Sequence, residues 1–310
     1  MNQSSQQSFE VGRRLTLPPL PLPKEIRSLF EFCNKDKFQA INDVDLAKHI
    51  QQIRAKIELI TPWPCLYWYS FLPHAGSIRN VSLPLTYQRV LAHLKSNPQA
   101  KILDMGCMIG HDSRILLQDG VRSNQIVCSD LYSNLFCLGN EMFADSMKDD
   151  HLCGIQWKVV DIFDQDKVDQ LRIPGGYYAI YTAKFIHLFT YAQQVQVITT
   201  LKSLLSKESG ATLFGTDCGR KDGQEGLFDL RSGMKMGPIS SIDTNEPKEM
   251  FHHSCSSFHR LITEAQDDAN WNVEVELKET DPPKGDGEIA CDPAYTQSLR
   301  GHLRWTVTRK

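Results

Sequence analysis

The sequence predicts an α/β fold in which helices alternate with the strands of one mostly parallel, seven-stranded sheet. The first observation that favours it is the apolar pair Ile102-Leu103, which runs directly into a glycine-containing turn, Asp104 to Gly110. Four more apolar segments of strand length follow, at 125–130, 156–161, 177–182 and 211–215. Two final strands, at 272–278 and 302–308, would close the sheet as an antiparallel hairpin.

Segments with helical periodicity precede and separate these strands. In the clearest of them, 43–59, Ile50, Ile53 and Ile57 fall on one face. Asp43 stands at its start, where a short acidic side chain caps a helix. The other expected helices are 24–35, 84–96, 191–206 and 254–269. Strands and helices in this alternation place the ligand site at the carboxyl ends of the parallel strands.

Composition along the chain divides it into three parts. Residues 1–24 are rich in Gln and Ser and then in Pro, so we expect a disordered tail. Residues 25–98 would form a helical and aromatic cap, and 99–310 the sheet domain. Within that domain, 217–250 are rich in Gly, Asp and Lys with little periodicity, which predicts a loop insertion at the active site.

The overall composition excludes several classes of protein. A formal charge of −3 with 41% hydrophobic residues gives no electrostatic footprint for nucleic acid. Nine scattered cysteines without a C-x-x-C pair argue against a disulfide framework and a zinc site, and we expect no metal. The first 24 residues lack an apolar signal region, and the uncharged stretch 61–78 contains too many prolines for a membrane span. We therefore expect a cytoplasmic protein.

The turn after the first strand carries the strongest functional signal. Its glycines, Gly106 and Gly110, permit a tight turn and a close approach of backbone to a ligand. Asp104 stands where it would repel a bound pyrophosphate, and Met108 and His111 break the dinucleotide pattern G-x-G-x-x-G. A cofactor with an ammonium, a sulfonium and no phosphate suits the acid better. We therefore expect S-adenosylmethionine, whose class I methyltransferases carry the motif D-x-G-x-x-x-G.

Residues at the ends of the next strands complete the expected cofactor site. Asp130 lies 20 residues after Gly110, the spacing at which Rossmann-type sites hold ribose hydroxyls. Asp161 and Ile162 follow the third strand, where methyltransferases commonly bind the adenine amino group and ring. We add Leu131 and Thr182, which stand at the ends of the second and fourth strands. The alternative is that the two acids are ordinary helix caps.

From about residue 55 onward the chain resembles the fungal methyltransferases of meroterpenoid biosynthesis. The resemblance rests on the segments 64–72, 103–112, 129–130, 161–163 and 185–189, on His253 with Ser257-Phe258, and on 303–305. It implies a Rossmann-like class I methyltransferase fold and a fungal secondary-metabolite pathway. It also implies that the acceptor is a small apolar acid, a prenylated polyketide whose carboxyl group becomes a methyl ester. Tyr67 stands where the family commonly has arginine, and 217–250 match the family poorly.

The chemistry of the acceptor decides which side chains are needed. A carboxylate with a pKa near ~4 is ionised at neutral pH and needs no general base, whereas a phenol near ~10 needs one. His187 and His253 are the candidates for a positioning or basic role. Each has an alternative interpretation, as a packed histidine and as a polar residue near a helix start. Methylation of a phenol, nitrogen or carbon therefore stays open.

An aromatic block in the cap supplies candidate acceptor contacts. Trp63, Tyr67, Trp68 and Tyr69 would line an apolar acceptor site, or would simply pack the N-terminal helices on the sheet. A non-catalytic methyltransferase-like subunit is a further alternative, supported by Met108 where the motif usually has a third glycine. The sequence leaves a homodimer open.

Overall fold

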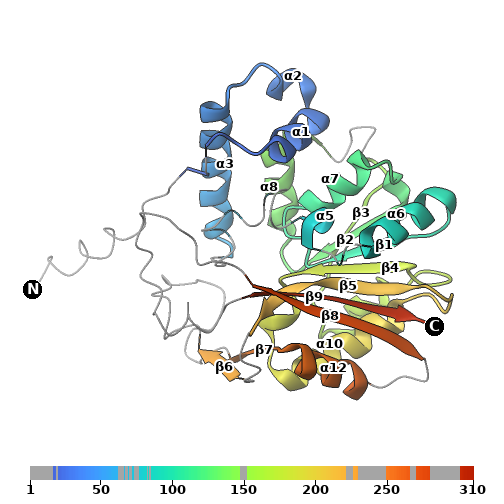
Figure 1. Cartoon of the computed structure of the whole chain (residues 1–310). Helices are drawn as coiled ribbons and strands as arrows, with labels where there is room; N and C mark the ends of the chain where they lie inside the picture. Colours follow the sequence, from blue (N-terminus) through green and yellow to red (C-terminus); the bar gives the residue numbers. More distant parts are fainter. Residues whose placement is uncertain are drawn as a thin grey trace, which may run out of the picture.

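The computed structural model describes residues 17–18, 20–61, 66, 69, 72, 77–81, 83, 85–146, 152–220, 226–229, 249–265, 270–279 and 301–310. A seven-stranded sheet forms the centre, in the order β3-β2-β1-β4-β5-β9-β8 (Figure 1). Its strands are β1 (Ile102–Met105), β2 (Ile126–Asp130), β3 (Gln156–Val159), β4 (Ala179–Ala183), β5 (Thr212–Gly219), β8 (Trp271–Glu279) and β9 (Gly301–Arg309). Strands β1 to β5 pair in parallel, and β9 pairs antiparallel with both β5 and β8. This order and direction confirm the predicted class I methyltransferase fold.

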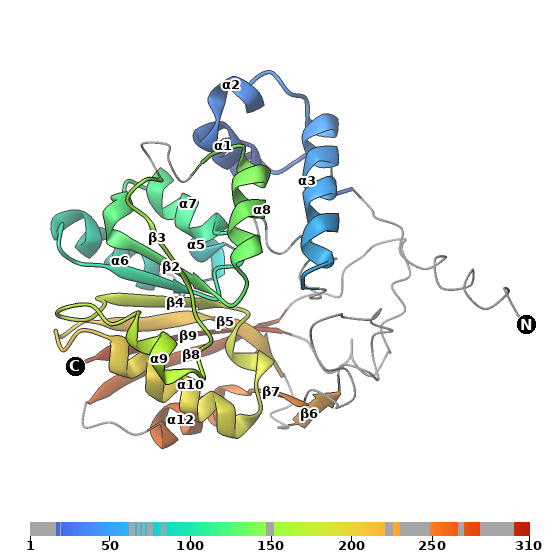
Figure 2. The ribbon, with the colours of Figure 1, turned by 180° about the vertical axis from the view of Figure 1, so that it is seen from behind.

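Helices cover both faces of the sheet, which explains why its strands are continuous apolar runs. On one face lie α6 (Thr86–Ser96), α7 (His111–Gln118) and α8 (Ser133–Phe143), with the short α5 (Ile78–Val81). The other face carries α9 (Gln165–Asp169), α10 (Tyr191–Leu204) and α12 (Cys255–Glu264), as Figure 2 shows from behind. Successive strand residues point to opposite faces of the sheet. Ile102 therefore packs in the hydrophobic core on the side of α7, and Leu103 packs in the core on the side of α10.

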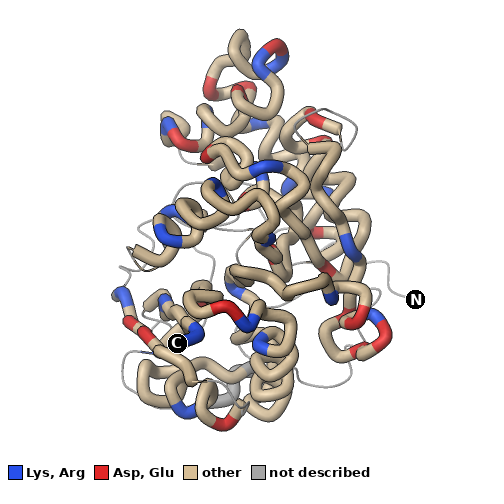
Figure 3. The backbone as a smooth tube through the Cα atoms, turned by 90° about the vertical axis from the view of Figure 1, so that its right-hand side faces the viewer, with Lys and Arg blue, Asp and Glu red and all other residues tan. Residues whose placement is uncertain are grey.

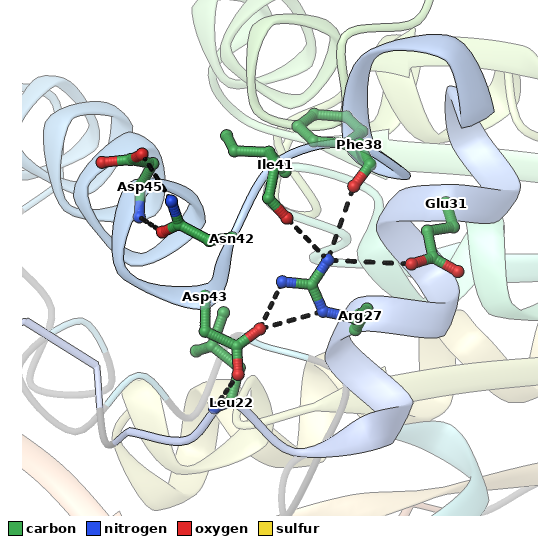
Figure 4. Close-up of polar contacts among 8 residues, drawn as sticks. All are labelled: Leu22, Arg27, Glu31, Phe38, Ile41, Asn42, Asp43 and Asp45. Carbon is green, nitrogen blue, oxygen red and sulfur yellow. Dashed lines mark hydrogen bonds and ion pairs between the residues drawn. The ribbon is translucent and has the colours of Figure 1, made fainter.

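The N-terminal cap consists of α1 (Lys24–Cys33), α2 (Lys35–Phe38) and α3 (Asp43–Glu58). Asn42 caps α3 by accepting from the Asp45 amide at 2.9 Å, so the predicted cap, Asp43, is wrong by one residue. Asp43 instead binds Arg27 of α1 and accepts from the Leu22 amide at 3.2 Å (Figure 4). Leu22 is buried, so the end of the expected tail packs on the cap.

Other boundaries differ from the sequence prediction for local reasons. The helix expected over 24–35 breaks at Asn34, whose side chain accepts from the Lys37 amide and begins α2. The expected insertion 217–250 begins within β5, which continues to Gly219. A two-stranded antiparallel sheet of β6 (Gly226–Asp229) and β7 (Glu249–His252) follows. Residues 221–225 and 230–248 of the predicted insertion lie outside the described residues.

Register places the ends of the central strands side by side. Met105 at the end of β1 pairs with Ser129 of β2 and with Thr182 of β4. The turns that follow β1, β2 and β4 therefore meet at one edge of the sheet. Charged residues of both signs are distributed along the backbone in the view of Figure 3. Among the helices that the structure describes, none has the length and apolar character needed to cross a membrane.

Candidate active site

The glycine turn adopts the conformation that its motif requires. Gly106 and Gly110 have φ values of 72° and 68°, in the left-handed region that favours glycine. A Cβ at Gly106 would lie 2.7 Å from Cδ2 of Phe185, in the turn after β4. Met108, where the motif usually has a third glycine, has a φ of 54°. The backbone therefore keeps the glycine-like conformation even though this position carries a side chain.

Two buried carboxyl groups lie next to this turn. Asp104 is 3% exposed and accepts from the Ser113 hydroxyl at 2.8 Å, while Asp112 accepts from the Ile78 amide at 2.8 Å. Burial, reinforced by the nearby charge of Asp112, raises the pKa of Asp104 to about 8. Burial likewise raises the pKa of Asp112 to about 7. A bound cation would stabilise their ionised forms, so the pair suits a positively charged ligand.

The second expected acid joins the turn to β2. Asp130 accepts from the Met108 amide at 2.8 Å and from the Tyr132 amide at 3.2 Å. Burial raises the pKa of its carboxyl group, and these backbone donors oppose the shift. Leu131 is 49% exposed beside it, and Val159 at the end of β3 is 46% exposed. An acid and two exposed apolar side chains thus lie at neighbouring strand ends.

The third acid shapes its own turn. The exposed Asp161 accepts from the Phe163 amide at 3.0 Å, while Ile162 is buried. The Phe163 ring lies edge-to-face with Phe189, with ring centroids 5.2 Å apart. Thr182 is fully buried, and its hydroxyl has no hydrogen-bond partner within the described part of the chain. This hydroxyl faces Gly215 of β5, where a Cβ would lie 2.8 Å from it.

His187 is held by an acid that the sequence prediction missed. It lies in a short 3-10 turn, Ile186–Leu188, after β4. Its Nδ1 lies 2.9 Å from Oδ1 of Asp217, which also accepts from the His187 amide at 3.2 Å. Burial alone lowers the pKa of His187, but the charges of Cys218 and Asp217 more than offset this and raise it to about 9. His187 is therefore an imidazolium at neutral pH.

Further nitrogen groups surround His187. Lys184, at the end of β4, has a φ of 54° and its Nζ is hydrogen-bonded to Nδ1 of His302 on β9. Burial, together with the neighbouring positive charges of His187 and Lys184, lowers the pKa of His252 well below its ordinary value. Its ring centroid lies 5.5 Å from that of His187. Burial raises the pKa of the Cys218 thiol, but His187 and Lys184 oppose it, and the net value is lowered to about 7.

The other candidate histidine, His253, is linked to two helices. Its Nδ1 lies 2.9 Å from the Ser257 hydroxyl of α12, and its Nε2 contacts Oε1 of Gln194 on α10. Gln194 in turn donates to the carbonyl oxygens of Phe189 and Phe251. Burial lowers the pKa of His253 to about 4, so it is neutral at physiological pH. Both ring nitrogens are engaged within the protein.

Of the aromatic block, the structure describes Tyr69 alone. Tyr69 is buried, and the guanidinium of Arg54 on α3 lies 5.0 Å from its ring centroid. This contact packs Tyr69 against the cap. Trp63, Tyr67 and Trp68 lie outside the described residues.

The residues that sequence reasoning missed here are Lys184, Asp112, Asp217 and Cys218. A signal was available for Asp217, because it follows an apolar strand just as Asp104, Asp130 and Asp161 do. The predicted fifth strand ended at 215, before Asp217, whereas β5 extends to Gly219. Asp112 and Lys184 stand within segments already assigned to the motif and to the turn after β4. Their burial and contacts could be learned only from the tertiary structure.

No family model matches this chain. Methyltransferase trt5 of Aspergillus terreus is 25% identical over 244 residues, which cover 79% of this chain and 78% of the relative. The Asnovolin E/Chermesin D methyltransferase nvfJ of Aspergillus novofumigatus is 27% identical, covering 70% of this chain and 78% of the relative. O-methyltransferase atr3 of Stereocaulon alpinum is 26% identical, covering 82% of this chain and 66% of the relative.

Among solved structures, magnesium protoporphyrin IX methyltransferase from Synechocystis, with bound SAH, aligns with a TM-score of 0.45 and 11% identity. The alignment covers 84% of this chain and 100% of that chain. The sequence relatives confirm the resemblance predicted from the motifs, and the strand order shows the fold independently of them. The chain is a homologue of methyltransferases of fungal secondary metabolism and has the class I methyltransferase fold.

Proposed function

We propose that this S-adenosylmethionine-dependent methyltransferase converts a carboxylate of an apolar metabolite, of the prenylated polyketide class, into a methyl ester. The observation that carries the proposal is His187, which is held by Asp217 and has a pKa raised to about 9, in the same turn as Lys184 and at the same sheet edge as the buried acids Asp104 and Asp112. A cationic cofactor and an anionic acceptor would each meet the opposite charge there.

The ends of β1, β2 and β3 form the cofactor half of the site, and their residues fit S-adenosylmethionine. Asp104 and Asp112 would bind its cationic methionine end, with Gly106 and Gly110 admitting it close to backbone. Asp130 would bind ribose hydroxyls through the carboxylate lone pairs that its backbone donors leave open. Further contacts are proposed for Leu131, Asp161, Ile162 and Thr182. When bound, the cofactor supplies a methyl group bonded to a sulfonium sulfur, for which the neutral thioether is a good leaving group.

The ends of β4, β5 and β9 form the acceptor half of the site, which would position an anion. An imidazolium at position 187 is a donor, so it pairs with a carboxylate and cannot remove a proton from a phenol. The bound cofactor would supply the methyl group, and the part of this chain would be to align the acceptor carboxylate and to exclude water. The ester is neutral, so its attraction to His187 is lost after the reaction. That loss favours product release.

Other candidate residues take different roles in this proposal. His253 links α12 to α10 and is no base, because both its nitrogens are engaged. We assign Tyr69 to packing of the cap on Arg54. Trp63, Tyr67 and Trp68 are kept as proposed contacts to the apolar part of the acceptor. The O-methyltransferase names of relatives from Stereocaulon alpinum and a fungal species support transfer to oxygen.

A matched pair of acceptors tests the proposal. The purified protein is incubated with S-adenosylmethionine and either a prenylated polyketide acid or the same compound with its carboxyl group converted to an amide. We expect one added methyl group on the acid alone, and its release by mild alkaline hydrolysis. A product that resists hydrolysis would contradict carboxyl methylation and indicate a methyl group on a phenol, nitrogen or carbon. Failure to bind the cofactor in a calorimetric titration would instead support a non-catalytic subunit.

A further inference from the structure

Asp217 uses both carboxylate oxygens to join three parts of the protein. Oδ1 accepts from the amide of His187 at 3.2 Å and lies 2.9 Å from its Nδ1. Oδ2 accepts from Nε1 of Trp305 on β9 at 3.0 Å. Asp217 is 3% exposed, so these bonds are shielded from water. A buried carboxylate with this many donors is fixed in position.

The contact with Trp305 depends on a gap in the neighbouring strand. Gly215 of β5 pairs with Trp305 in the sheet. A Cβ at Gly215 would lie 2.9 Å from Cζ2 of the Trp305 ring and still closer to the Thr182 backbone. The absence of a side chain therefore lets the indole lie against β5, where its N–H reaches Asp217. The sequence Gly215-Thr216-Asp217 thus provides both the space and the acceptor.

We propose that Asp217 is the positioning residue for the acceptor: it fixes the orientation of the His187 ring and supports its positive charge, and Trp305 holds Asp217 in place. The inference rests on the proposed function, in which His187 binds a carboxylate. With Nδ1–H donated to Asp217, the imidazolium has Nε2–H as its second donor, which we assign to the acceptor carboxylate. Because one carboxylate oxygen receives both the backbone and the ring of His187, the ring cannot turn without losing a bond.

The charge of His187 makes this inference measurable. Besides Asp217, three groups interact with this charge, namely Cys218 on β5, His252 on β7 and His302 on β9. Lys184, after β4, is hydrogen-bonded to His302. Lys184 carries positive charge, and His252 and His302 are neutral because burial lowers their pKa values. Cys218 and Asp217 are thus the groups that favour the imidazolium. Acceptor binding should persist until the pH rises through about 9, the pKa of His187.

The central experiment compares Asp217→Asn with wild type by two readouts. The pKa of His187, followed by NMR, should fall by at least about one unit, because a neutral amide no longer stabilises the imidazolium. The value of kcat/KM should fall about 10- to 100-fold, and the decline at high pH should begin at lower pH. Affinity for S-adenosylhomocysteine should stay unchanged. Asp166→Asn, on the exposed surface of α9, is the matched control.

Each outcome is decisive. Equal His187 titration in wild type and Asp217→Asn would overturn the inference and leave the proposed function standing. If instead wild type makes no methyl ester, the proposed function fails while the NMR titration still tests the link between Asp217 and His187. If Asp217→Asn does not fold, the NMR titration of the wild-type protein tests the inference by itself. A pKa of His187 below 7 would then overturn the inference. Trp305→Phe should lower kcat/KM about fivefold, for one lost hydrogen bond, and leave the high-pH decline in place.

Discussion

The two halves of the sheet edge differ in charge and in how their side chains are held. In the cofactor half, at the ends of β1, β2 and β3, Asp130 and Asp161 are fixed by backbone amides. In the acceptor half, at the ends of β4, β5 and β9, His187 and Lys184 are held by other side chains. A backbone frame is largely insensitive to which side chains surround it, whereas a side-chain network is changed by a single substitution.

This difference bears on how related enzymes diverge. The motif residues of the cofactor half were recognisable in the sequence because their spacing is set by the turn and strand geometry. The partners of His187 lie far from it in the chain, since Asp217 is 30 residues and Trp305 118 residues away. We therefore expect substitutions in the cofactor half to act on cofactor binding and stability, and those in the acceptor half to act on acceptor binding and pH dependence.

The largest expected effect breaks the support of the cofactor half. Arg114 and Asp145 form a fully buried bidentate pair, with two N–O distances of 2.7 Å. Arg114 also donates to the carbonyl oxygens of Ile109 and Gly110, so it anchors the glycine turn. Asp145→Ala should reduce the free energy of unfolding by about 3–5 kcal/mol, because it leaves a buried guanidinium without its counter-ion. Urea denaturation measures this loss.

The matched control is Asp169→Ala, which removes the partner of Arg172 in an exposed pair. Surface pairs of this kind contribute about 0–1 kcal/mol. Similar losses in the two variants would show that the buried pair does not support the turn.

The second prediction concerns the opposite pH dependences of the two halves. Asp104 has a pKa of about 8 in the ligand-free protein, raised by burial and by Asp112. A bound cation lowers that pKa, so binding releases a proton, and cofactor affinity should rise about tenfold from pH 6 to 8 and then level off. Asp104→Asn should weaken binding by about 1–3 kcal/mol and flatten this dependence. Calorimetry in buffers of different ionisation enthalpy measures both; a steady affinity in wild type would contradict the charge assignment.

The third prediction uses Cys218 as a probe of the acceptor half. Its thiol has a pKa of about 7, lowered by His187 and Lys184 against the effect of burial. The rate at which iodoacetamide modifies Cys218 should therefore reach half its maximum near pH 7, with the exposed Cys137 and Cys153 as references, since the thiolate is the nucleophile. Mass spectrometry of modified peptides gives the rates. His187→Gln should slow modification of Cys218 alone; an unchanged rate would show that no imidazolium lies beside the thiol.

How much could be predicted from the sequence follows the same division. The strands of the central sheet and the glycine turn were predicted because local apolar runs and turn residues determine them. The acceptor network could not be predicted, because Asp217, Lys184 and His302 come together only when β4, β5 and β9 pair. At both boundary errors a tertiary contact holds the polar residue concerned: Asp43 binds Arg27 and leaves the cap to Asn42, and Asn34, which begins α2, also donates to the Ala144 carbonyl.

The smallest expected effect concerns Met108, the position at which the motif departs from its usual form. Its φ of 54° costs a non-glycine residue about 1–2 kcal/mol. Met108→Gly relieves that cost, but glycine also has more freedom in the unfolded chain, worth about 0.5–1 kcal/mol. The variant should therefore be more stable by less than about 1 kcal/mol, measured by thermal unfolding. Cofactor affinity should change less than about threefold, because the Met108 amide already donates to Asp130 in this conformation. A large gain in affinity would show that the methionine side chain obstructs the cofactor, and would revive the interpretation of the chain as a non-catalytic subunit.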